Sequence, residues 1–131
     1  MKTMRIILGL FLLLLISCGK TINSNEILNN ENDFKLTIYL ENKYSSDSSK
    51  VEVINRDSEK IAKLRNWISN NAAGWQRSIA SWGTPEISLI GTNFRLLIFK
   101  DFVVVGFTDK KGKAQQYTKP IIKSQFDFLF D

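Results

Sequence analysis

Between residues 86 and 118 the chain alternates short apolar runs with turn residues, and this pattern restricts the fold more than any other feature. The runs have the length of single strands, and their connections are only a few residues long. One connection, Asp109-Lys110-Lys111-Gly112, is a strong turn signal, because glycine accepts the positive φ that a hairpin requires. The segment is therefore expected to form an antiparallel β-meander, with strands at Glu86–Ile90, Phe94–Lys100, Phe102–Thr108 and Lys113–Thr118.

Two further strands are expected before the meander. Residues 34–40 alternate, so that Phe34, Leu36 and Ile38 share one face of a half-buried strand. A second run at residues 50–55 places Val51 and Val53 on one face. The polar stretch at residues 42–49 would connect the two strands as a long hairpin loop.

One long helix is expected between these strands and the meander. Asp57 or Ser58 can act as the N-cap, because a side-chain oxygen there accepts from the free amides of the first turn. Apolar residues then recur at helical spacing as far as Trp75, and Gly74 is expected to end the helix, which supports a helix to about Asn71. The apolar stripe consists of Ile61, Leu64, Ile68, Ala72 and Trp75.

Together these elements predict an α+β domain. Its antiparallel meander would have about five to six strands, with one main helix packed on it and a short C-terminal helix capped by Ser124. The runs at residues 96–99 and 102–105 are apolar on both faces, as in central strands that are covered on both sides. The main helix would cover one face, and a partner, a second sheet layer or another copy of the chain would cover the other.

The N-terminus has the features of an export signal. Lys2 and Arg5 precede an apolar run from Ile6 to Ile16. This run is shorter than the roughly 20 residues that a bilayer-spanning helix needs. It is followed by Leu15-Ile16-Ser17-Cys18, a branched apolar residue two places before a small residue and then cysteine.

This leader resembles that of bacterial lipoproteins, whose lipobox has the same order of residues. The resemblance implies that Cys18 receives a diacylglyceryl group, that signal peptidase II removes residues 1–17, and that the acylated Cys18 becomes the new N-terminus with palmitate-type chains. Gly19 stands where an aspartate would resemble the inner-membrane retention signal, so the outer membrane is expected in a bacterium that has one. The alternative is that Cys18 is an ordinary small residue in a conventional signal peptide.

The expected organisation therefore has three parts. Residues 1–17 form the cleaved signal peptide, and residues 18–33 form the acylated N-terminus and a flexible tether, because they are rich in asparagine and poor in large apolar side chains. Residues 34–131 form a single α+β domain. A tether of this length would reach about 20 Å and let the domain tumble near the membrane.

Several kinds of chemistry are excluded by residues that the sequence lacks. It contains no histidine and one cysteine, so a Ser-His-Asp or Cys-His arrangement and a zinc site of histidine and cysteine cannot form within one chain. The carboxylates show no pairing, and no enzyme activity, cofactor or metal is expected. The formal net charge of +5 is too small to indicate nucleic acid as a partner.

Two groups of residues are candidates for contact with a partner. Trp75 and Trp82 bracket a glycine-edged connection, and tryptophan is common both in cores and at binding hot spots. Lys110, Lys111 and Lys113 surround the Asp109–Gly112 turn, where they either keep a turn soluble or contact an acidic partner or anionic lipid headgroups.

The sequence thus favours a non-enzymatic, lipid-anchored binding module of the cell envelope. It would contact a protein partner there, as an inhibitor or immunity-type protein does. The alternatives are a structural accessory lipoprotein of an envelope assembly complex, which would expose a large apolar patch, and a small carrier of lipid or another ligand, which would need a dry cavity.

Overall fold

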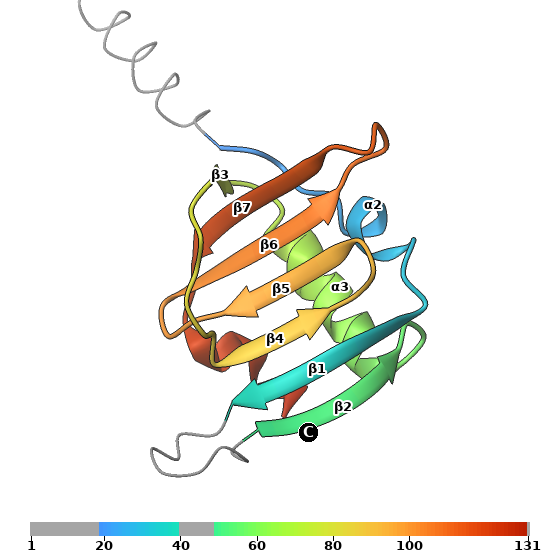
Figure 1. The fold of residues 1–131 in the computed structure, drawn as a ribbon. Helices are drawn as coiled ribbons and strands as arrows, with labels where there is room; N and C mark the ends of the chain where they lie inside the picture. Colours follow the sequence, from blue (N-terminus) through green and yellow to red (C-terminus); the bar gives the residue numbers. More distant parts are fainter. Residues whose placement is uncertain (1–18, 40–48, 131) are drawn as a thin grey trace, which may run out of the picture.

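A seven-stranded antiparallel sheet forms the body of the protein in a computed structural model that describes residues 19–39 and 49–130 (Figure 1). The strand order is β2-β1-β4-β5-β6-β7-β3. The leading hairpin therefore joins the meander through a β1–β4 pair. The strands are β1 (Asp33–Tyr39), β2 (Ser49–Asn55), β3 (Gln76–Arg77), β4 (Ile87–Ile90), β5 (Phe94–Ile98), β6 (Phe102–Thr108) and β7 (Ala114–Pro120).

The α+β class and the antiparallel sheet are confirmed, but the sheet has more strands than the five to six expected. The additional strand is β3, which has two residues and pairs with β7 at the end of the sheet. Its sequence has no apolar alternation, and only its position beside β7 makes it a strand. The turn prediction at Gly112 is confirmed, since this glycine has a φ of 75°.

Helix α3 (Glu59–Asn70) is the predicted main helix, and Figure 1 shows it crossing one face of the sheet. The Ser58 hydroxyl accepts from the Ile61 amide at 3.3 Å, which confirms the N-cap. The helix ends at Asn70 with Asn71 as its C-cap, close to the predicted end, and Gly74, with a φ of 82°, follows three residues later. Its buried stripe consists of Ile61, Leu64, Trp67 and Ile68.

The hydrophobic core lies between α3 and the sheet. Its centre is a row of side chains in register across five strands, and every member is buried. The described chain ends in the 3-10 helix η1 (Lys123–Leu129), where a short helix was expected, and Phe126 and Leu129 of this helix are also buried. The prediction that Ser124 caps it is wrong, because the helix begins after Ile122 with no side-chain cap. The row consists of Leu36, Leu89, Leu96, Val105 and Tyr117.

The expectation that residues 18–33 form a flexible tether is wrong for the part that the structure describes. Residues 24–28 form the helix α2 (Ser24–Leu28), which begins after the N-cap Asn23. Ile22, Ile27 and Leu28 are buried in the core. The amide and carbonyl of Lys20 exchange hydrogen bonds with those of Trp75 at 2.8 and 3.1 Å. This segment has few apolar side chains, but those three are all buried in the core, and their burial outweighs the polar composition of the segment.

Candidate functional site

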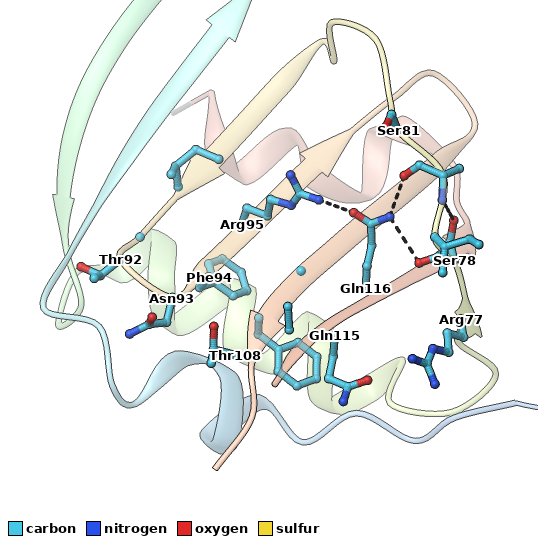
Figure 2. Close-up of a pocket in the computed structure, with 17 residues that line it drawn as sticks. Arg77, Ser78, Ser81, Thr92, Asn93, Phe94, Arg95, Thr108, Gln115 and Gln116 are labelled. Atoms are coloured by element: carbon cyan, nitrogen blue, oxygen red, sulfur yellow. Dashed lines mark hydrogen bonds between the residues drawn. The ribbon is translucent and has the colours of Figure 1, made fainter. Parts of the chain in front are cut away.

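The face of the sheet opposite α3, called the open face below, carries a cleft of about 700 Å³ (Figure 2). Its floor belongs to one register row, in which Ile90, Arg95, Gly106 and Gln116 follow one another across β4, β5, β6 and β7. One wall is the segment 77–81, which leaves β3 and leads towards β4. The turn between β4 and β5 closes another side.

A hydrogen-bond network fixes the wall to the floor. The Arg95 guanidinium donates to the Gln116 side-chain oxygen, and the Gln116 amide donates to the carbonyl of Ala80 at 2.9 Å and, more weakly, to that of Ser78 at 3.4 Å. The Ser78 amide donates to the Gln116 carbonyl at 3.0 Å. Figure 2 shows Gln116 between Arg95 and Ser78. The network therefore positions the Arg95 guanidinium beside the cleft.

Gly106 is needed for this arrangement. A Cβ at this position would lie 2.8 Å from Nε and 3.0 Å from Cγ of Arg95. The missing side chain lets the Arg95 stem lie across β6 and reach Gln116 on β7.

A buried carboxylate holds the β4–β5 turn. Glu31 is 1% exposed, and its two oxygens accept from the amides of Thr92 and Asn93, each at 2.6 Å. A Cβ on Gly91 would lie 2.4 Å from the Glu31 carboxylate, so this turn needs glycine for a close approach. The N-terminal segment thus shapes one end of the cleft.

The cleft is positively charged. Arg95 lies on its floor, whereas Arg77 lies at its edge, on the same side of the sheet as its strand partner Tyr117. No aspartate or glutamate is among the described residues that line the cleft. In the described part of the chain the ion pairs are Glu52–Lys60 and Glu59–Lys63, so neither arginine is neutralised there. A third cation, Lys35, pairs with Ile90 on the neighbouring strand and is exposed on the same face.

Trp75 is a core residue, so its selection as a partner contact is wrong. It is 1% exposed, its indole N–H donates to the Asn71 carbonyl at 2.8 Å, and its ring meets Trp67 edge-on with centroids 6.1 Å apart. The ammonium of Lys119 lies 5.7 Å from the centre of its ring.

Lys119 lies beside the C-terminal end of α3. Its ammonium donates to the carbonyls of Asn71 and Ala73 beyond the end of that helix. Burial lowers the pKa of this lysine below its ordinary value.

Trp82 lies half-buried in a separate aromatic cluster. Its ring centre is 5.1 Å from that of Phe102 and 6.1 Å from that of Phe99, and these two phenylalanines stack at 4.5 Å. Its indole nitrogen is buried and has no hydrogen-bond partner within residues 19–39 and 49–130. The role of Trp82 as a partner contact stays a prediction.

The three lysines of the β6–β7 hairpin, Lys110, Lys111 and Lys113, are exposed, and their role also stays a prediction. Asp109 organises this turn by accepting from the backbone amides of Lys111 and Lys113, each at 2.9 Å. The Lys113 amide, the Gln115 side chain and then Lys111 hold the pKa of Asp109 below its ordinary value, against a smaller opposing effect of burial.

Sequence reasoning missed Arg77 and Arg95. A signal was present for Arg95, since it occupies the outward position between Phe94 and Leu96 in an apolar strand. No local signal identifies Arg77, because it joins the cleft only through the pairing of β3 with β7.

No protein-family model, curated protein or solved structure matches this chain. The predicted lipidation site, Cys18, lies outside the described residues. Within residues 19–39 and 49–130, no helix has the length and apolar character to cross a bilayer. In the same ranges no cluster of three or more potential metal ligands of the His, Cys, Asp and Glu types occurs.

Proposed function

We propose that this protein is a non-enzymatic, lipid-anchored binding module of the bacterial cell envelope, and that it contacts a protein partner as an inhibitor or immunity-type protein does. The observation that supports this function best is the charged cleft on the open face. The cleft has a volume of about 700 Å³, and it is lined by the Arg95 guanidinium, which Gln116 holds in place. The described helices lie on the other face of the sheet.

The lipobox and the fold together suggest which end of the domain a lipid anchor at Cys18 would hold at the membrane. Only Gly19 separates Cys18 from Lys20, whose backbone is bonded to that of Trp75 just before β3. Two residues span at most about 7 Å. An acyl group on Cys18 would therefore hold the β3–β7 end of the sheet against the bilayer, with no long tether. Figure 1 shows the N-terminal end of the described chain beside these strands.

Lipid attachment and partner binding can be tested together. Mass spectrometry of the protein extracted from membranes should show a diacylglyceryl mass on a chain that begins at Cys18. Cross-linking in intact cells, followed by purification, should recover one stoichiometric protein partner. An unmodified leader would refute the anchor, and repeated recovery of the protein alone would refute the binding role.

A structural accessory role is the second candidate, and exposed valines on the edge strand favour it. Val53 is 72% exposed and Val51 is 53% exposed, both on β2, which among the described strands lies at the edge of the sheet. This role predicts that Val53→Lys disrupts assembly into a larger complex. Binding of the partner through the cleft would be insensitive to the same change.

The cleft does not favour a lipid carrier. A lipid chain needs a dry apolar cavity, whereas arginine and glutamine side chains line this one.

A further inference from the structure

We propose that the cleft on the open face binds an acidic, extended peptide segment of the partner, with Arg95 as the residue that recognises its carboxylates. This inference rests on the proposed function, because it names the chemistry of the partner that the binding module recognises.

The first argument is charge. Arg95 lies on the floor of the cleft, no carboxylate is among the described residues that line it, and Lys35 adds a second cation on the same face. A guanidinium presents paired N–H donors that match the two oxygens of a carboxylate. An occupant that carries carboxylates is therefore favoured over a neutral or cationic one.

The second argument is preorganisation. The Gln116 side-chain oxygen accepts a hydrogen bond from the Arg95 guanidinium. Because this bond already restricts the arginine, it loses less rotamer freedom when it binds a ligand. Gln116 in turn is held by the backbone of the wall segment. Such a supported arginine is typical of a built recognition site rather than of a solvated surface charge.

The third argument is the mixture of apolar and amide groups, which favours a peptide over a small anion. Ile79 on the wall is 96% exposed, and Ile90 on the floor is 39% exposed. Phosphate would leave these side chains in water, whereas a peptide can cover them with its own apolar residues. Asn93 also lines the cleft and can pair with peptide amides.

The volume agrees with this occupant. About 700 Å³ lies within the range of roughly 300–1,000 Å³ that is usual for ligand pockets, and it exceeds what one phosphate fills. The strands of the floor run beneath the wall segment, so an extended chain can lie between the wall and the β4–β5 turn (Figure 2).

Binding can be measured with the full chain in detergent micelles and a fluorescein-labelled hexapeptide in which glutamate alternates with leucine. The same peptide with glutamine in place of glutamate is the control. We expect saturable anisotropy with the glutamate peptide, and binding at least about tenfold weaker with the glutamine peptide, as for the loss of a hydrogen bond to a charged group.

Variants of the protein locate the binding to the cleft. Arg95→Gln should weaken binding of the glutamate peptide about tenfold. Arg56→Gln is the matched control, since Arg56 is exposed and lies outside the cleft, and it should leave binding unchanged. Ser81→Glu adds a carboxylate at an exposed position of the wall without removing an arginine, so it should also weaken binding, whereas Ser81→Gln should not.

Three results would overturn the inference. The first is equal affinity for the two peptides or no saturable binding of either. The second is complete displacement of the peptide by an equal concentration of inorganic phosphate, which would indicate a simple anion site. The third is cross-linking of the cellular partner to Arg95→Gln as efficiently as to the native chain, which would leave the binding role intact. Failure of the native chain to capture any partner would instead refute the proposed function.

Discussion

Glu31 offers the sharpest test of how this fold is held together. Its buried carboxylate connects the N-terminal segment to the β4–β5 turn through two backbone amides, each at 2.6 Å. In Glu31→Ala both amides lose their acceptor. A hydrogen bond to a charged group contributes about 1.5–3 kcal/mol. Thr92 and Asn93 are themselves exposed, so water can reach the freed amides, and the lower part of this range applies.

We therefore expect Glu31→Ala to lower the free energy of unfolding by about 2–3 kcal/mol in total, from two bonds at the lower end of that range after partial rehydration. Glu31→Gln keeps the side-chain volume and one acceptor, and should cost about half as much. Urea denaturation, monitored by tryptophan fluorescence, measures both losses of stability. The slope of the free energy of unfolding against urea concentration should stay unchanged if only the native state is destabilised.

Glu26→Ala is the matched control, because Glu26 is an exposed glutamate on the neighbouring helix α2, and it should change stability by less than about 0.5 kcal/mol. A loss for Glu31→Ala that is no larger than that of the control would refute the reasoning. It would show that the N-terminal segment does not hold the turn through this carboxylate.

Three further predictions concern residues whose roles the structure separates. Trp75→Ala should lower the free energy of unfolding by about 3–5 kcal/mol, as for a buried aromatic side chain. Trp82→Ala should lower it by only about 1–2 kcal/mol, because only its ring contacts are lost. Equal losses of stability in thermal denaturation would contradict this difference. Lys119→Met keeps the apolar stem but removes the cation at the end of α3, so the free energy of unfolding should fall by about 1 kcal/mol, and an unchanged value would mean that the ammonium does not stabilise the helix end. The pKa of Asp109 is lower in the folded state than in the unfolded state, so its stabilising effect is present above the unfolded value of about 3.8 and is lost as the pH falls through the lower folded value. The amide resonance of Lys113 should therefore titrate with a midpoint below that value in NMR spectra, and Asp109→Asn should abolish the titration.

The sequence by itself determined the elements whose signals are local. Alternation along β1, the serine at the start of α3 and the glycine in the β6–β7 turn act through neighbours within a few residues, so their structure follows from the chain nearby. Exclusion of histidine chemistry also follows from composition alone.

The tertiary structure decided the rest, because the contacts concerned join residues that are far apart in the chain. Glu31 meets the turn more than 60 positions away, and no local pattern marks an asparagine-rich segment as part of the core. Arg95 and Gln116 meet the wall segment only when β3 pairs with β7 and that segment folds over the sheet. A binding site assembled from separate strands depends on strand order, and the periodicity of single strands does not encode that order.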